Sequence, residues 1–456
     1  MKNFKNKYTR SLLNVIPGGA HTYSRGHDQY PSNAPSILSR GKGAYIFDEK
    51  NNKYLDYGMG LRSVNIGYAE KKINDGAIYQ IKNGNNLTRP SLVELKAANL
   101  LTSIINSADM VKFTKNGSTA VTAAVKLARA YNRKKIILRC SDHPFFSYDD
   151  WFIGSTMIKR GIPKDISNLT INFRYNDIEG LKKIIKKFKS KGISCLVLEP
   201  ATNVCPEINS ITGCCMKSQC SRKYFSNKHF LKEVEELCKE NNIVFILDEM
   251  ITGFRWHLKG AQYMYNISPD ISNFGKAMAN GFSVACVAGK KDIMELGSIT
   301  KKNQERVFLL STTHGAEMSG LGAFIETVKF IKDNDVIKQN WKFGYNLSTG
   351  ANQISKDMGL ENNFYFSGPS CSPIYACKDN NFKDSMIFKT IFVQEMIKNK
   401  IFMPWVSISF RHKQKELNKT LTGIEKSLNV FKKALKGNPK RFIKGDIIKP
   451  VFRKYN

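Results

Sequence analysis

The feature that most constrains this chain is a short apolar run, residues 243–248 (IVFILD), that ends in an acid. A run this short, rich in β-branched residues and closed by a charge, is typical of a buried parallel strand. Ligands of open α/β sheets bind beyond the carboxyl ends of the strands. The run therefore predicts an α/β fold with a mainly parallel sheet, and it places Asp248 at the edge where a ligand would bind.

A single lysine follows in the segment 272–281 (SNFGKAMANG), directly after Gly275 and in otherwise uncharged surroundings. The 28 residues from Asp248 to Lys276 are enough for one crossover and the next strand. Pyridoxal 5'-phosphate (PLP) requires this pair of groups, because a carboxylate keeps a proton on its ring nitrogen and a lysine forms a Schiff base with its aldehyde. A lone lysine in such a turn is more often a surface residue, so the interpretation depends on Asp248 and on an anion site.

An anion site is predicted where Gly117, Ser118 and Thr119 precede a helical run over residues 121–131. The start of a helix presents unpaired N–H groups and the positive end of its dipole, and the glycine lets a ligand approach the backbone. Serine and threonine also cap helices without binding anything. Together with Asp248 and Lys276, the segment is predicted to hold the phosphate of the cofactor.

Five motifs together resemble the class III PLP-dependent aminotransferases of fold type I, closest to the glutamate-1-semialdehyde 2,1-aminomutase-like branch. They are DEMITGFR at 248–255, FGK at 274–276, NGST at 116–119, PGG at 17–19 and STTHG at 311–315. The resemblance implies a mainly parallel central sheet flanked by helices, plus a smaller α+β C-terminal domain. It divides the chain into an N-terminal arm and hairpin (1–70), a large PLP-binding domain (71–315) and a small domain (316–456).

The resemblance also assigns residues around the cofactor. Asp248 and Lys276 are the catalytic pair. Phe145 stands where relatives carry the tyrosine of a Tyr-His-Gly pattern, so it can stack on the pyridine but cannot donate a hydrogen bond; it could also be a core aromatic. Asn203 is placed near the phenolic oxygen of PLP. Thr312 is placed at the phosphate of the neighbouring subunit, which implies a homodimer with shared active sites, although a helix cap would explain the same residue.

Three residues are candidates for binding the substrate. The segment 17–25 lines the substrate site of aminomutase-like relatives, so Arg25 is expected to pair with a carboxylate and Thr22 to add a hydroxyl. A surface arginine is the alternative for Arg25. Arg89 follows the tract 85–88, where typical aminomutases have small residues. A second cation would favour a substrate with an additional anionic group, but Arg89 could equally cap a neighbouring loop.

Composition excludes several other classes of protein. The chain has 71 basic and 38 acidic residues and a net charge of +33, spread along the sequence without a nucleic-acid-binding motif. We therefore expect a solvated basic surface and no specific nucleic-acid partner. No apolar run is long enough to span a membrane and the basic N-terminus lacks a signal-peptide core, so a cytoplasmic protein is expected.

Ten cysteines are expected to be mostly reduced. Four of them, Cys205, Cys214, Cys215 and Cys220, fall in a polar insert that lacks paired Cys-x-x-Cys spacing, which favours incidental thiols over a metal site.

The expected activity is transfer of an amino group on a small anionic amino-carbonyl substrate, with glutamate 1-semialdehyde as the named candidate. The alternative is a general class III transaminase that acts on a carbohydrate-derived or other anionic substrate. Arg89 and Phe145 keep this alternative open. A basic scaffold without catalysis is the least favoured interpretation, because the Asp248–Lys276 pair is intact.

Overall fold

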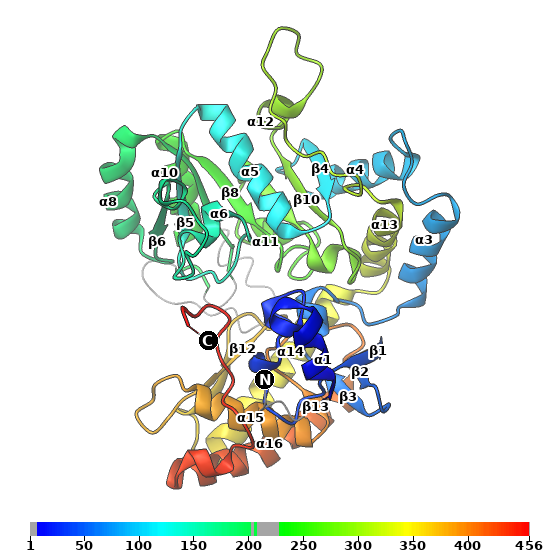
Figure 1. The fold of residues 1–456 in the computed structure, drawn as a ribbon, viewed down its shortest axis with the longest axis vertical. Helices are drawn as coiled ribbons and strands as arrows, with labels where there is room; N and C mark the ends of the chain where they lie inside the picture. The colour runs from blue at the N-terminus through cyan, green and yellow to red at the C-terminus, as the bar shows by residue number, and fades with distance from the viewer. Residues whose placement is uncertain (1–6, 202–204, 208–227, 456) are drawn as a thin grey trace. The chain divides into compact units, whose positions relative to one another are not determined.

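The computed structural model describes residues 7–201, 205–207 and 228–455, and it divides into two compact units. One unit is residues 71–337. The other combines residues 1–70 with residues 338–456. Helix α14 (Val336–Asp357) carries the chain from the first unit into the second (Figure 1).

The unit of residues 71–337 is built on a seven-stranded sheet in the order β4-β10-β9-β8-β7-β5-β6. The strands are β4 (Met110–Thr114), β5 (Ile136–Cys140), β6 (Thr170–Phe173), β7 (Ile193–Leu198), β8 (Val244–Asp248), β9 (Ile271–Phe274) and β10 (Ala285–Gly289). Five of them run parallel, whereas β10 is antiparallel to both β9 and β4. Every residue of β5, β7, β8, β9 and β10 is buried, as expected for a sheet covered on both faces. The predicted mainly parallel α/β sheet is confirmed.

Helices precede β4 and follow most of the strands of this sheet (Figure 1). They are α3 (Lys71–Lys82), α4 (Leu92–Ile104), α5 (Gly117–Asn132), α6 (Asp150–Ile153), α7 (Lys164–Ser167), α8 (Ile178–Phe188), α10 (Phe230–Glu240), α11 (Gly260–Met264), α12 (Lys291–Met294) and α13 (Met318–Asp333). Helix α5 has a face of alanine, valine and leucine, and this face packs against β7, β9 and β10. The sheet therefore holds the N-terminus of α5 close to the carboxyl ends of the parallel strands.

The other unit draws one sheet from both ends of the sequence. Its strands β1 (Leu38–Lys42), β2 (Tyr45–Asp48) and β3 (Lys53–Asp56) form an antiparallel meander, which includes the predicted hairpin, and β13 (Ile401–Phe402) pairs parallel with β3. A second small sheet joins β11 (Phe364–Ser367) to β12 (Ile374–Cys377). The helices are α1 (Lys7–Val15), α2 (Met59–Arg62), α15 (Met386–Lys398) and α16 (Gln414–Lys436). One apolar core includes Leu55 of β3, Phe392 of α15 and Phe431 of α16.

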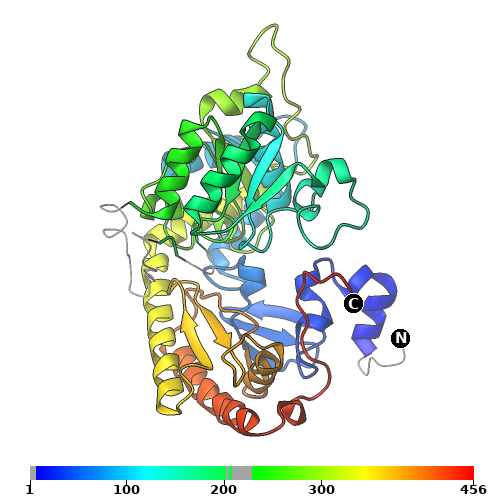
Figure 2. The same cartoon turned by 90° about the vertical axis from the view of Figure 1, so that its left-hand side faces the viewer.

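Helix α13 packs against α3 and α4 and belongs to the unit of residues 71–337. Residues 1–70 share a sheet with the C-terminal part of the chain, because β3 pairs with β13. The terminal segments also meet: the backbone N–H of Lys449 donates to the carbonyl of Asp28 (2.9 Å), and Figure 2 shows the C-terminal tail in red beside the N-terminal segment in blue.

Within the described part of the chain, no helix combines the length and the apolar character needed to cross a membrane.

Candidate active site

Asp248 is the last residue of β8 and is buried, with 3 % of its surface exposed. Its Oδ1 accepts a hydrogen bond from the backbone N–H of Met250 (2.8 Å). Burial raises the pKa of this carboxyl and the charge of Lys276 lowers it, so that the pKa is about 6. The structure thus brings the predicted acid within electrostatic reach of the predicted lysine.

Lys276 begins a short 3-10 turn, Lys276–Ala279, directly after β9. Its backbone has φ of 44°, in the left-handed region that costs a residue with a Cβ about 1 kcal/mol or more. The side chain is partly buried, in contrast to the exposure of most lysines. A strained backbone in a buried turn fixes the direction in which the lysine leaves the sheet.

The first turn of α5 lies at the same edge. Asn116 caps the helix, because its Oδ1 accepts from the backbone N–H of Thr119 (2.9 Å) and from the Thr119 hydroxyl (3.0 Å). Ser118 is buried, and its hydroxyl accepts from the backbone N–H of Tyr148 (3.2 Å). Gly117 opens the helix without a side chain. The first-turn N–H groups of Gly117 and Ser118 have no intrahelical partner, so they can bind an anion.

Met250 contacts all three segments, and no sequence motif pointed to it. Its N–H donates to Asp248, and its sulfur fills the space above two glycines. A Cβ at Gly117 would lie 2.9 Å from this sulfur, and a Cβ at Gly275 would lie 2.6 Å from it. Both glycines are therefore needed for the close approach of α5 and of the Lys276 turn to the end of β8.

Phe145 lies in the loop after β5 with 46 % of its surface exposed, whereas its neighbour Phe146 is buried. The ring of Phe145 contacts the edge of Phe152 at 5.6 Å between centroids. Ser147 in the same loop lies 3.0 Å from the Thr122 hydroxyl of α5, so the loop is attached to the helix. Phe145 therefore lies at the surface of this unit and not in its core.

Tyr148 is a further candidate that sequence analysis missed. Its hydroxyl lies 3.3 Å from that of Thr119, at the start of α5, and the side chain is exposed. It can therefore contact an anion bound at the helix terminus. Sequence analysis could have found Tyr148, because it directly follows Phe145-Phe146-Ser147, the segment already selected for its aromatic residue.

The same edge of the sheet contains a buried polar group without a protein partner. Asn273 of β9 lies beside Asp248 in the parallel pair, and within the described residues neither atom of its side-chain amide has a hydrogen-bond partner. A buried amide of this kind calls for a polar ligand. A buried acid, a partly buried lysine, a helix N-terminus and this amide are the groups that a flat, phosphate-bearing pyridine requires, so the residues fit PLP.

Arg89 and Thr312 are both exposed and belong to this unit. Arg89 lies between α3 and α4, and Thr312 precedes α13. The two segments touch, because the side chain of Asn86 donates to the carbonyl of Thr313 (3.2 Å).

Thr22 and Arg25 belong to the other unit. Thr22 precedes a 3-10 turn, Tyr23–Arg25, which Tyr30 holds by donating from its hydroxyl to the carbonyl of Ser24 (2.8 Å). Arg25 is exposed and lines a cavity of about 1150 Å³ within this unit.

The loop after β3 lines the same cavity and has an unusual backbone. Four successive residues, 59–62, have φ between 41° and 66°, and only one of them is glycine. The buried carboxylate of Asp56 holds this left-handed turn by accepting from the N–H groups of Gly58 (2.7 Å) and Met59 (2.9 Å) and from the hydroxyl of Tyr68 (2.6 Å). Burial raises the pKa of Asp56 to about 6.

Asn203 lies outside the described residues, as do Cys214, Cys215 and Cys220 of the insert. Cys205 is described and is buried. Among the residues that the structure describes, no group of three or more histidine, cysteine or acidic side chains could hold a metal ion.

Comparison with known proteins decides the family. The model of the class III aminotransferases matches residues 26–204 and 221–362, which is more than half of the chain. The chain belongs to the class III aminotransferase family. It is therefore a PLP-dependent enzyme, and the resemblance stated from the motifs is confirmed.

Relatives within the family differ in activity. The chain is 30 % identical over 438 residues to a glutamate-1-semialdehyde 2,1-aminomutase of Methanosphaera stadtmanae, covering 91 % of this chain and 96 % of that protein. It is 28 % identical over 425 residues to a 3-aminobutyryl-CoA aminotransferase of Cloacimonas acidaminovorans, covering 92 % and 95 %. The structure of the Sphingopyxis sp. MTA144 FumI protein in its PLP internal aldimine form superposes with a TM-score of 0.80 at 22 % identity, covering 94 % of this chain and 96 % of that one. The last comparison confirms the fold type I architecture.

Proposed function

We propose that this class III enzyme moves an amino group on a small anionic amino-carbonyl substrate, and that glutamate 1-semialdehyde is the first candidate. The observation that carries the proposal is the electrostatic contact between Lys276 and the buried Asp248 at the carboxyl edge of the sheet. The aminomutase relative at 30 % identity supports the choice of substrate.

Each residue of the site has a role in this proposal. Bound PLP supplies a conjugated ring that withdraws electrons from the carbon bearing the substrate amine. Asp248, as a carboxylate, would hold a proton on the ring nitrogen. Lys276 Nζ would take a proton from the substrate carbon and return it at the next step. Gly117, Ser118 and Thr119 would hold the phosphate at the start of α5, and Phe145 would stack on the ring.

The roles of the remaining residues are proposed from the family resemblance. Arg25 binds the substrate carboxylate, with Thr22 beside it, and Asn203 contacts the phenolic oxygen of the cofactor. Arg89 is a second, exposed cation in a loop next to the Thr312 segment. It favours a second candidate function, a transaminase for a substrate with an additional anionic group, such as a carbohydrate-derived acid. The 3-aminobutyryl-CoA aminotransferase among the relatives supports this alternative.

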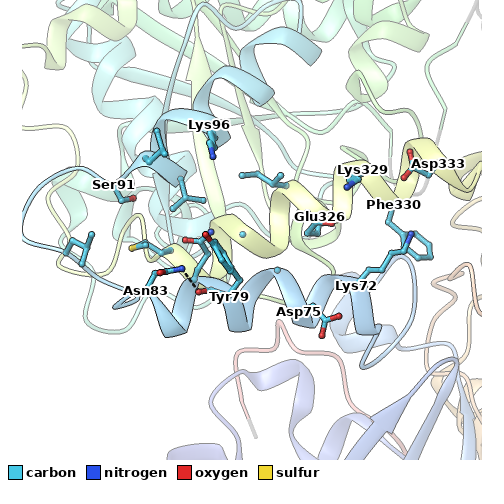
Figure 3. Close-up of a pocket in the computed structure, with 18 residues that line it drawn as sticks. Lys72, Asp75, Tyr79, Asn83, Ser91, Lys96, Glu326, Lys329, Phe330 and Asp333 are labelled. Atoms are coloured by element: carbon cyan, nitrogen blue, oxygen red, sulfur yellow. Dashed lines mark hydrogen bonds between the residues drawn. The ribbon is translucent and has the colours of Figure 1, made fainter.

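We also propose a homodimer with shared active sites, in which Thr312 reaches the cofactor phosphate of the partner. An apolar face on α3, α4 and the connecting loop supports this. Its exposed side chains are Ile78, Tyr79, Ile81, Leu87, Leu92 and Leu95. Three of them, Tyr79, Leu87 and Leu92, line a groove of about 660 Å³ between α3, α4 and α13 (Figure 3). Exposed apolar side chains that gather on one face are typical of a protein–protein interface.

The charges around this groove favour a second copy of the chain as the partner. Lysines and carboxylates alternate along it, as Figure 3 shows for Lys72, Asp75, Glu326 and Lys329. A two-fold interface brings the same surface together from both subunits, so a face with both signs can pair with itself. Cytoplasm is the proposed location, since the seven described cysteines are buried and free.

The cofactor linkage is tested first. Purified protein is expected to absorb near ~410–430 nm, and the band should vanish on borohydride treatment and in Lys276→Ala. A Lys276→Ala protein that keeps a borohydride-sensitive band would overturn the assignment of Lys276.

The substrate is tested separately by incubating the holoenzyme with glutamate 1-semialdehyde and analysing the products. Formation of 5-aminolevulinate supports the aminomutase. If none forms, while an amine donor from a screen of amino acids bleaches the cofactor band, the transaminase alternative holds instead.

A further inference from the structure

Three segments of the unit of residues 71–337 meet at one carboxylate that no motif identified. Glu317 lies just before α13, five residues after Thr312. Its Oε2 pairs with the ammonium group of Lys115, and its Oε1 accepts from the side-chain amide of Asn85 (2.8 Å). Each oxygen of the carboxylate therefore holds a different loop.

The Lys115 contact leads to the proposed phosphate site. Lys115 directly precedes Asn116, the N-cap of α5, and its carbonyl accepts from the hydroxyl of Ser283 (2.7 Å). The side chains of Lys115 and Glu317 are each only 26 % exposed, so water screens this ion pair less than it would on an open surface. The charge of Lys115 and its hydrogen bond, together with that from Asn85, lower the pKa of Glu317, which keeps the carboxylate ionised.

The Asn85 contact leads to the loop that carries Arg89. The carbonyl of Asn85 accepts from the N–H of Met318 (2.8 Å), and its side-chain oxygen accepts from the N–H of Ser319 (3.0 Å). Asn85 thereby satisfies the first N–H groups of α13, which have no partner within the helix. The neighbouring Asn86 binds the carbonyl of Thr313. The loop before α4 and the segment of Thr312 are thus held together around Glu317.

We propose that Glu317 is a positioning residue of the active site. Its carboxylate fixes the entry to α5, the Arg89 loop and the Thr312 segment in one arrangement, so that the phosphate-binding groups of α5 and Thr312 are set by the same residue. The proposal depends on the proposed roles of α5 and Thr312. It does not depend on which substrate the enzyme uses.

The test separates the ion pair with Lys115 from the hydrogen bond with Asn85. Glu317→Gln keeps an oxygen that can accept from Asn85 but removes the charge that pairs with Lys115. The readout is retention of PLP by the purified holoenzyme, measured as the dissociation constant on reconstitution of the apoenzyme. We expect it to rise roughly tenfold, since a charge-assisted contact that orders the start of α5 is lost. Glu305→Gln, which removes an exposed carboxylate twelve residues earlier, is the matched control and should bind PLP as the unchanged protein does.

A charge swap distinguishes positioning from general destabilisation. Lys115→Glu combined with Glu317→Lys restores an ion pair at the same place, but the lysine cannot accept the hydrogen bond from Asn85, so we expect the double variant to bind PLP more tightly than either single variant without reaching the original value. Hydrogen exchange provides a readout independent of the cofactor: Asn85→Ala should increase exchange in residues 83–90 and 311–319 and leave residues 135–140 unchanged. Unaltered PLP retention in Glu317→Gln, or a swap that binds PLP no better than either single variant, would overturn the proposal.

Failure of the proposed phosphate site gives a different result. In that case Ser118→Ala and Thr119→Ala would retain PLP as well as the unchanged protein, whatever the effect of Glu317→Gln.

Discussion

The pKa of Asp248 lies above that of a free aspartate, because burial favours the protonated form more strongly than the charge of Lys276 opposes it. A protonated ring nitrogen would add a second positive charge and shift the balance further toward the carboxylate. Asp248 therefore gains its full charge when the cofactor is in place, which suits a residue that keeps a proton on the ring.

Replacing this acid by its neutral isostere tests that role. Asp248→Asn should keep the fold and slow the amine half-reaction by about 10²–10³-fold, because the charge that holds the ring proton is lost. The measurement is the single-turnover rate at which an amine donor bleaches the cofactor band. Asp142→Asn, which removes an acid from an ion pair with the exposed Arg174, serves as the control. A rate within about threefold of the original would exclude this role.

His412 makes the stability of the other unit depend on pH. It is buried against the rings of Tyr57 (4.6 Å) and Phe343 (5.4 Å), and burial lowers its pKa to about 4 although the charge of Glu416 raises it slightly. The unfolded chain, with a histidine pKa near ~6.5, binds a proton more readily, so stability falls as the pH falls through this range.

His412→Asn should remove this part of the pH dependence. Between pH 7.5 and pH 5, the stability advantage of the unchanged protein over the variant should shrink by about 2 kcal/mol. Urea unfolding at the two pH values measures it. An advantage that stays constant or grows would show that the buried ring is not neutral.

At the residue scale the sequence identified the candidate catalytic residues but not the residues that hold them in place. A strand that ends in an acid and a lysine after a glycine are local signals, so Asp248 and Lys276 could be found. Met250 could not, because its contacts with Gly117 and Gly275 exist only once three distant segments have come together. Glu317 escaped notice for the same reason, since its partners lie more than 200 residues away.

At the scale of single elements, the C-terminal tail is attached to the N-terminal segment. Arg453 pairs with Asp28 (2.6 Å), and both side chains are mostly buried. Asp28 lies three residues after Arg25, so the tail limits the motion of the turn that carries the proposed carboxylate-binding residue. An isolated partly buried ion pair of this kind contributes about 1 kcal/mol.

Loss of this ion pair should loosen the turn. Arg453→Gln is expected to speed tryptic cleavage after Arg25 about fivefold, as a contact of about 1 kcal/mol implies for local opening. Mass spectrometry of the peptides measures the rate. Arg441→Gln, an exposed arginine nearer the start of the tail, should leave the rate unchanged. Equal rates in the two variants would mean that Arg453 does not restrain the turn.

Most elements followed from local patterns, whereas their pairing did not. Local patterns in the sequence indicate several elements. They are the apolar runs of β5, β7 and β8 and the amphipathic run of α8. Such patterns do not indicate the antiparallel direction of β10 or the pairing of β13 with β3, because both depend on long-range hydrogen bonds that leave no periodic signal.

At the scale of the whole molecule, the proposed dimer has a direct test. Leu92 is the first residue of α4 and is 67 % exposed within the apolar face. Leu92→Glu would bury an unpaired charge in the interface and should weaken association at least about 100-fold. Light scattering after gel filtration measures the mass. Ile299→Glu, at an 84 % exposed apolar residue outside this face, is the control. A Leu92→Glu protein that remains dimeric at micromolar concentration would place the interface elsewhere.

The pairing of β13 with β3 also sets an order of events during synthesis. Residues 71–337 leave the ribosome as a complete unit before β3 has its partner strand. A ribosome that adds 5–20 residues per second synthesises Ile401–Phe402 about 20–70 s after it has synthesised β3. Throughout that interval the nascent hairpin keeps an open strand edge, the kind of surface on which chaperones act and at which aggregation begins. A chain whose synthesis ends before residue 400 would therefore contain all of residues 71–337, whereas its other unit would lack β13 and keep the edge of β3 unpaired.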